Sequence, residues 1–113
     1  MALSRKFRLS GPEIKKVFKN GSDLNSELFQ LKFLPIASVA AKFAVIVGSR
    51  VSKKASIRNK IRRKFSEIIR LNISKIRPGY LILIVAKPKL ASTKIDNLGR
   101  ELMELMNKIG QLK

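Results

Sequence analysis

The fold is decided by one stretch of the sequence, residues 42–86, which reads KFAVIVGSRVSKKASIRNKIRRKFSEIIRLNISKIRPGYLILIVA. Residues 42–48 and 80–86 are short and predominantly apolar, which predicts two buried strands. Between them, one face of a predicted helix is formed by four apolar residues at helical spacing: Ile57, Ile61, Phe65 and Ile68. This order predicts a βαβ unit. We expect strand 42–48 to be more central in the sheet than the strand before it, because it is mostly apolar on both faces.

The residues before this unit predict a helix and one more strand. Ser10-Gly11-Pro12-Glu13 has the pattern of a capping box, with Ser10 as the N-cap and Glu13 reaching back to its amide. An apolar stripe follows, and Asn20-Gly21 ends the helix after about two turns. Residues 28–34 alternate between apolar and polar side chains, which is typical of a strand with one buried face. Pro35 ends this strand or marks a sheet edge.

The C-terminal part predicts a last helix that begins at Ser92-Thr93. Its apolar stripe is Ile95, Leu98, Leu102, Leu105, Met106 and Ile109. Gly99 interrupts this helix at a cost of about 1 kcal/mol relative to Ala. The chain is therefore expected to be one small α+β domain, an α-β sandwich with the order α-β-β-α-β-α. We assign residues 1–113 to a single domain, with a flexible basic N-terminus at residues 1–9.

The charge is strongly positive. Twenty-five Lys and Arg face seven Asp and Glu, which gives a net charge of +18, while 45% of the residues are hydrophobic. A folded domain with this charge repels itself, and a polyanionic partner offsets that cost. Residues 50–70 hold nine Lys or Arg and one acid, Glu67. The arc opposite the apolar stripe is polar: Arg62, Asn59, Arg70, Arg63 and Lys60. This favours phosphate contacts with a nucleic acid over an anionic membrane surface, another acidic partner or an ordinary solvated helix.

The composition removes most classes of active site. The chain has no His and no Cys, which excludes an imidazole base, a thiolate nucleophile and Cys-ligated zinc. Asp23 and Glu27 could in principle hold Mg²⁺, but a solvated loop is the favoured interpretation. The longest apolar run, residues 80–86, is far shorter than the roughly 20 residues of a spanning helix, so we expect a cytoplasmic protein. We expect no small-molecule substrate, and any catalysis to come from another molecule.

Residues 50–63 resemble the signature of the bacterial ribonuclease P protein subunit. That signature is a strand, an S-K-K loop and a helix that opens with R-N-[RK]-[IL]-[KR]-R. The loop is matched here by Ser52-Lys53-Lys54, and the helix by Arg58-Asn59-Lys60-Ile61-Arg62-Arg63. Residues 12–21 look like the first helix of the family, and residues 80–88 look like its last strand and the following turn. The resemblance covers about residues 5–110.

The resemblance implies a fold and a division of labour. The fold is ribosomal protein S5 domain 2-like, with a left-handed βαβ crossover, although steric preference alone favours the right hand. In the family's enzyme, the RNA subunit cuts the 5′ leader from precursor tRNA with Mg²⁺. The implied partners of the protein are this catalytic RNA and the leader, and the protein alone holds no cofactor.

The resemblance also implies two groups of site residues. The positions matched to contacts with the catalytic RNA are Arg50, Ser52, Lys53, Lys54, Arg58, Asn59, Lys60, Arg62 and Arg63. The positions matched to the leader-binding cleft are Ile14, Phe18, Phe29 and Lys32. Ile14 and Lys32 depart from the family, which often has aromatic residues there. Core packing is an alternative role for Phe18 and Phe29. A small basic ribosomal protein or a DNA-compacting protein would share the same size and charge.

Overall fold

The computed structural model describes residues 7–36, 41–92 and 97–110. The helices and strands are α1 (Gly11–Asn20), β1 (Ser22–Asn25), β2 (Phe29–Pro35), β3 (Lys42–Ile46), α2 (Ala55–Asn72), β4 (Tyr80–Ala86) and α3 (Leu98–Lys108). Two short 3-10 helices, η2 (Ile73–Lys75) and η3 (Pro88–Ser92), follow α2 and β4. The strands form one four-stranded sheet in the order β1-β2-β4-β3. The α+β sandwich expected from the sequence is confirmed.

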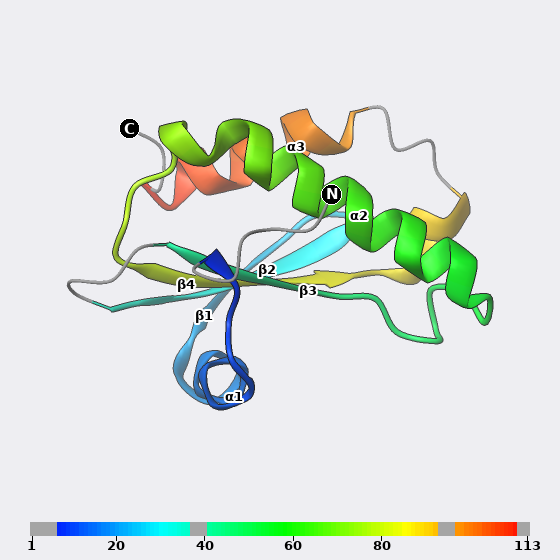
Figure 1. The fold of residues 1–113 in the computed structure, drawn as a ribbon, viewed down its shortest axis with the longest axis horizontal. Helices are drawn as coiled ribbons and strands as arrows, with labels where there is room; N and C mark the ends of the chain where they lie inside the picture. The colour runs from blue at the N-terminus through cyan, green and yellow to red at the C-terminus, as the bar shows by residue number, and fades with distance from the viewer. Residues whose placement is uncertain (1–6, 37–40, 93–96, 111–113) are drawn as a thin grey trace.

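The sheet separates two hydrophobic clusters. Figure 1 shows α2 and α3 on one face of the sheet and α1 on the other. Side chains alternate along β4 because successive residues of a strand point to opposite faces. Ile82 and Ile84 therefore belong to the larger cluster below α2 and α3, whereas Leu81 and Leu83 belong to the smaller cluster against α1. Strand β4 is buried on both faces, as its continuous apolar sequence predicts.

Helix α1 begins with the predicted capping box. The amide of Ser10 donates to Glu13 Oε1 over 2.8 Å, and the amide of Glu13 donates to Ser10 Oγ over 3.3 Å. The helix ends where predicted, at Gly21, whose amide donates to the carbonyl oxygen of Val17 over 2.8 Å. A Cβ atom at this glycine would lie 2.5 Å from that oxygen, so no larger residue fits without a shift.

Strand β1 is the element that the sequence does not predict. Residues 22–25 were expected in a loop, but they pair antiparallel with β2, and Asp23 lies opposite Lys32. Three of the four residues are Ser, Asp and Asn, and of these Asp and Asn are depleted in strands, so local sequence gives no strand signal. Residues 22–25 form a strand because the free edge of β2 offers them backbone hydrogen-bond partners. The expected order of elements is therefore one strand short, and Pro35 ends a strand that lies inside the sheet.

Strand β3 was expected to be more central than β2, and this expectation is wrong. Among the described strands β3 pairs only with β4, and β4 takes the central place beside β2. The apolar character of β3 has another cause: α2 covers one of its faces, and its outer edge is partly covered by the N-terminal segment. The amide of Leu9 donates to the carbonyl of Phe43 over 2.9 Å, and Leu9 is buried. The backbone of residues 7–9 is therefore held against β3, although a flexible N-terminus was expected, while the Arg8 side chain is exposed. Residues 1–6 lie outside the described part.

The βαβ unit is present as predicted, since β3 and β4 are parallel neighbours joined by α2. In Figure 1 both strands run in the same direction, β3 lies nearer the viewer and α2 lies above them. This arrangement is the left-handed crossover that the resemblance implied. The last helix begins at Leu98, so Gly99 lies in its first turn and does not interrupt it. The expected start at Ser92-Thr93 falls partly outside the described residues, and Ser92 itself ends η3.

Candidate nucleic-acid interface

The loop before α2 is braced by its own side chains. The hydroxyl of Ser52 accepts a hydrogen bond from the amide of Lys54 over 3.2 Å. The guanidinium of Arg58 reaches back from the first turn of α2, and its Nη1 donates to the carbonyl of Ser52 over 2.9 Å. Arg58 is half-buried in this position. The signature Ser and Arg therefore fix the loop and the helix relative to each other, which keeps Lys53 and Lys54 in a defined place.

The N-terminus of α2 is suited to bind an anion. Its N-cap, Lys54, makes no side-chain hydrogen bond to the helix, and no acidic residue lies in the first turn. The free amides and the helix dipole make this end electropositive. Lys53 and Lys54 are exposed and add to that charge, which disfavours the helix when no partner is present. A phosphate at this end would satisfy the amides and neutralise the lysines.

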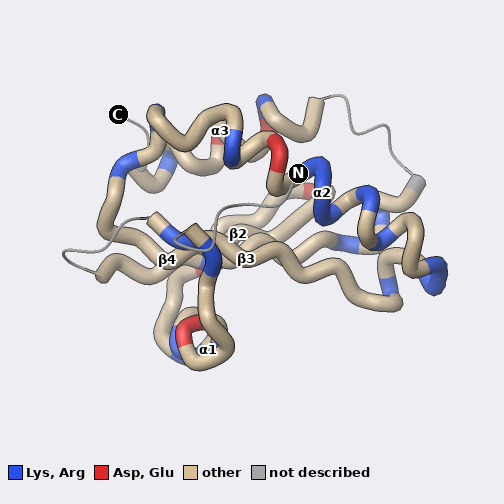
Figure 2. Tube along the Cα trace, in the orientation of Figure 1, with Lys and Arg blue, Asp and Glu red and all other residues tan. Residues whose placement is uncertain are grey.

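Helix α2 divides into a packing face and a cationic face. The predicted packing residues Ile61, Phe65 and Ile68 are buried, and Ile57 is half-buried against the same core. Figure 2 shows Lys and Arg along this helix and the preceding loop. By sequence, the single acid of α2 is Glu67. The predicted contact residues that are exposed are Arg50, Lys53, Lys54, Asn59, Lys60 and Arg63. The three half-buried ones are Ser52, Arg58 and Arg62. All nine lie on the loop and the first turns of α2.

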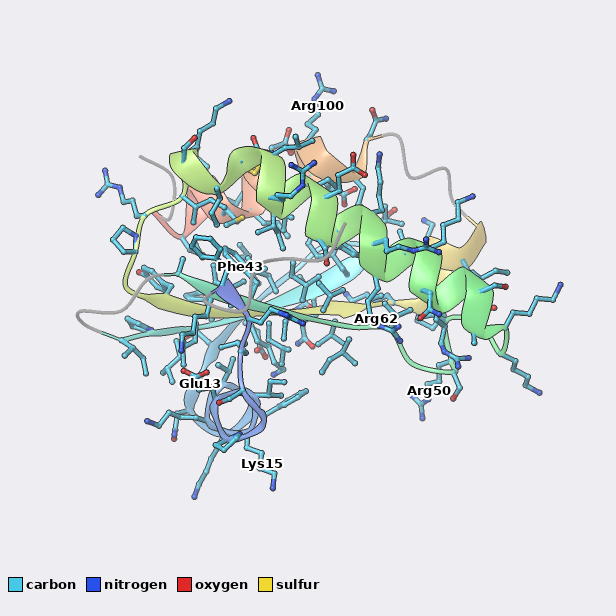
Figure 3. All side chains as sticks on the ribbon, in the orientation of Figure 1. Glu13, Lys15, Phe43, Arg50, Arg62 and Arg100 are labelled. Atoms are coloured by element: carbon cyan, nitrogen blue, oxygen red, sulfur yellow. The ribbon has the colours of Figure 1, made fainter. Side chains whose placement is uncertain are left out.

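Arg62 differs from its neighbours on this helix. It was expected on the outward arc, but it is half-buried, and its Nη1 donates to Oδ1 of Asn59 one turn earlier. In Figure 3 it reaches from α2 toward the sheet. Asn59 thus orients a guanidinium as well as presenting its own amide.

A second group of predicted residues meets on the opposite face of the sheet. Phe18 of α1 is 48% exposed, although it is a large apolar residue, and Ile14 is half-buried one turn before it. The Nζ atom of Lys32 on β2 lies 5.4 Å from the centroid of the Phe18 ring, within the range of a cation–π contact. The core alternative for Phe18 does not fit this exposure. Ile14, Phe18 and Lys32 therefore line one surface between α1 and the sheet.

Lys32 has a partner that the sequence did not reveal. Its Nζ forms an ion pair of 2.9 Å with Asp23 Oδ1 on β1, and its side chain is only 15% exposed. The sequence prediction assigned Asp23 to a loop, so no signal placed it opposite Lys32. This pairing means that Lys32 supports the position of the Phe18 ring, and that any contact of Lys32 with a phosphate competes with Asp23.

Phe29 does not belong to this surface, which corrects the leader-cleft assignment. It is fully buried, and its ring makes an edge-to-face contact with Phe65 of α2, with centroids 5.4 Å apart. Phe29 and Lys32 stand three residues apart in β2, so their side chains point to opposite faces of the sheet. The alternative role of Phe29, core packing, is the one that the structure supports.

The described part of the chain offers no conventional catalytic centre. No group of three or more Asp and Glu side chains is placed to hold a metal ion within it. None of its helices is both long and apolar enough to cross a membrane.

The sequence model of the family "Ribonuclease P" matches residues 3–110. The chain belongs to the ribonuclease P protein family. It is 29% identical over 114 residues to the ribonuclease P protein component of Rippkaea orientalis, covering 96% of this chain and 90% of that one. It is 39% identical over 69 residues to that of Fusobacterium nucleatum, over 61% of each chain.

Solved structures agree. The ribonuclease P protein of Thermotoga maritima superimposes with a TM-score of 0.80 at 25% identity, over 89% of this chain and 96% of that one. The Staphylococcus aureus protein shares the fold, with a TM-score of 0.84 at 16% identity over 95% and 98%. This chain is thus the protein component of an endoribonuclease ribonucleoprotein that matures the 5′ end of tRNA, and it works with an RNA subunit.

Proposed function

We propose that the protein binds its two RNA partners on opposite faces of the sheet. The loop and first turns of α2 contact the catalytic RNA, and the surface between α1 and β2 holds the single-stranded 5′ leader of precursor tRNA. The observation that carries this proposal is the exposed ring of Phe18. An apolar ring held half in solvent beside a lysine is a stacking platform for a base, whereas the core already has its own aromatic pair, Phe29 and Phe65.

The cationic face of α2 supports the first half of the proposal. Exposed lysine and arginine side chains on one helix release counterions when they neutralise phosphates, which makes binding strong and dependent on salt. The guanidinium groups add bidentate contacts that a lysine cannot make. A protein of net charge +18 between two polyanions also reduces the repulsion between them, which lowers the Mg²⁺ concentration that the complex needs.

In this proposal Mg²⁺ is bound mainly by the RNA subunit, and the protein acts in the cytoplasm with its RNA partners. The protein's own residues position and neutralise, and they perform no step of bond cleavage. The absence of a metal-binding acid cluster in the described residues is compatible with this division, but it does not carry the proposal.

Reconstitution tests the proposed function. The full chain is mixed with a cognate catalytic RNA, and cleavage of precursor tRNA is followed over a range of Mg²⁺ concentrations. We expect cleavage at the mature 5′ end at a Mg²⁺ concentration too low for the RNA alone, and no cleavage by the protein alone at any concentration. Cleavage that survives removal of all RNA but disappears in a point variant of this chain would refute the proposal.

A further inference from the structure

A cavity opens at the outer edge of β3, between the N-terminal segment and α2. Its volume is about 270 Å³, and it is lined by Arg8, Leu9, Phe43, Ala44, Val45, Arg62 and Ser66. Two arginines and one hydroxyl therefore face it, and none of the lining residues is acidic. The two arginines come from segments more than fifty residues apart in the sequence, and Arg62 reaches toward the cavity from α2 (Figure 3).

The backbone of β3 contributes a donor to the same cavity. In a parallel ladder the backbone N–H and C=O groups of successive residues point alternately to the two sides of the strand within the sheet. The carbonyl of Phe43 accepts a hydrogen bond from the amide of Leu9, so the backbone N–H and C=O groups of Phe43 point away from β4. Val45 is two residues further along β3, so its backbone groups point the same way, and it lies beyond the bridge between Arg8 and Phe43. Its N–H group therefore points out from the edge of the sheet, where the cavity lies.

The neighbouring cavity provides a contrast. It has a volume of about 430 Å³ and shares Arg8 and Leu9, but its other lining residues are Ser10, Glu13 and Lys42. Glu13 and Lys42 form an ion pair of 3.1 Å, which neutralises the lysine, and the carboxylate repels an anion. Of the two cavities, only the one with Arg62 has donors without an acid, so it is the one suited to an anion.

We propose that the cavity lined by Arg8, Arg62 and Ser66 binds one phosphodiester of an RNA strand. The two guanidinium groups hold the phosphate oxygens, and the Val45 amide and the Ser66 hydroxyl complete the set of donors. The apolar wall of Leu9, Phe43 and Ala44 packs against the attached ribose or base. A guanidinium presents a planar pair of N–H groups that matches phosphate and carboxylate oxygens alike. We assign a phosphodiester because the chain belongs to a family that works with an RNA subunit.

The inference rests on the proposed function for the identity of the strand. The edge of β3 lies between the α2 face, assigned to the catalytic RNA, and the α1 face, assigned to the leader (Figure 1). A strand that passes from one face to the other crosses this edge. The phosphodiester belongs either to the catalytic RNA or to the leader, and both present the same chemistry to the two arginines.

The first experiment uses inorganic phosphate as the probe and needs no RNA. Amide resonances of the full chain are followed by NMR during a phosphate titration, and we expect saturable shifts at Val45 and Ser66. Arg8→Gln should weaken this binding by roughly tenfold or more, since it removes a charge-assisted contact. Arg70→Gln is the matched control, because it removes one arginine from the exposed part of α2 outside the cavity and should leave the shifts unchanged. Shifts that spread along α2, or that survive Arg8→Gln, would overturn the site.

The second experiment identifies the strand. Binding of the Arg8→Gln protein is measured to the catalytic RNA alone, and binding of its holoenzyme to precursor tRNA with long and short leaders. A loss with the catalytic RNA alone assigns the phosphodiester to that RNA, and a loss confined to long leaders assigns it to the leader. Unchanged affinity in both assays would refute an RNA occupant. If the wild-type protein bound neither RNA, the proposed function would fail, while the phosphate titration would still decide the cavity.

Discussion

Replacement of Phe18 by alanine separates the leader-binding surface from the core. The ring is 48% exposed and stands over Lys32, on the face of the sheet opposite the larger hydrophobic cluster. Full burial of such a side chain is worth about 1.5–3 kcal/mol, so half-burial contributes about 1–1.5 kcal/mol to folding. A stacked base contributes about 1–3 kcal/mol to RNA binding. We therefore expect a small loss of stability and a larger loss of leader affinity.

The assay compares leader lengths in the reconstituted holoenzyme. Phe18→Ala should weaken binding of precursor tRNA with a leader of several nucleotides by about 5- to 150-fold, which is the stacking energy expressed as an affinity ratio. Affinity for the catalytic RNA and for a one-nucleotide leader should stay the same, because neither places a base on this ring. The thermal midpoint, measured beside it, should fall by no more than about 5–10 °C for a domain of this size.

Phe29→Ala provides the contrast, because Phe29 of β2 lies in the core on the other face of the sheet. Phe29 is fully buried against Phe65, so its loss should cost about 3–5 kcal/mol and reduce every RNA contact together. Equal losses of Phe18→Ala for long and short leaders would refute the assignment of Phe18 to the leader surface. So would a fall in thermal midpoint as large as that of Phe29→Ala.

Three further predictions concern charge, packing and pH. Arg63→Ala should reduce the slope of log K against log salt for RNA binding by roughly 0.7–0.9. Arg58→Lys keeps the charge but loses the hydrogen bond to the Ser52 carbonyl, so it should lower the affinity for RNA and leave the slope unchanged. A fall in slope for Arg58→Lys would contradict this role of Arg58. Gly99→Ala should raise the free energy of unfolding by about 0.5–1 kcal/mol, because the new Cβ meets Ile68 at an ordinary 3.7 Å. A lower stability in thermal unfolding would show strain at this position. The pKa of Glu13 is lowered from 4.5, first by the Ser10 amide and then by Lys42. The ionised carboxylate therefore stabilises the fold above about pH 4.5, and this stabilisation is lost as the pH falls through the lowered pKa. The stability of Glu13→Gln should differ from that of the wild type at neutral pH and converge with it in acid, and a difference that is constant with pH would refute this.

Local patterns predicted the elements whose cause is local. The capping box of Ser10 and Glu13 lies within four residues, and the structure has both of its hydrogen bonds. The packing face of α2 follows from helical spacing alone, and residues such as Ile61 are buried accordingly. The continuous apolar sequence of residues 80–86 requires burial on both faces, which β4 has.

Features that depend on distant pairing were beyond the sequence pattern. Strand β1 exists because β2 offers it an edge, and the resulting ion pair of Asp23 with Lys32 could not be foreseen from either residue. Strand β3 lies at the edge because β4 pairs with both β2 and β3, and this pairing is not visible in the sequence of β3. The face on which Phe29 lies was left open because an alternating strand fixes two faces without saying which helix covers each. The handedness of the crossover came from the family resemblance and not from sterics.

The few acidic residues explain why the charge is available to a partner. Three of the six acids in the described part of the chain bind lysines: Glu13 with Lys42, Asp23 with Lys32, and Glu27 with Lys89. Among the described residues, no ion pair involves a cation of α2. These three acids connect different elements of the fold, whereas the Lys and Arg residues of α2 form no ion pair with an acid of the described chain. An anionic partner on that helix therefore completes the electrostatics of the folded chain. Added salt should raise the stability of the free protein, because it screens the self-repulsion, and should weaken RNA binding, because the release of counterions is then less favourable.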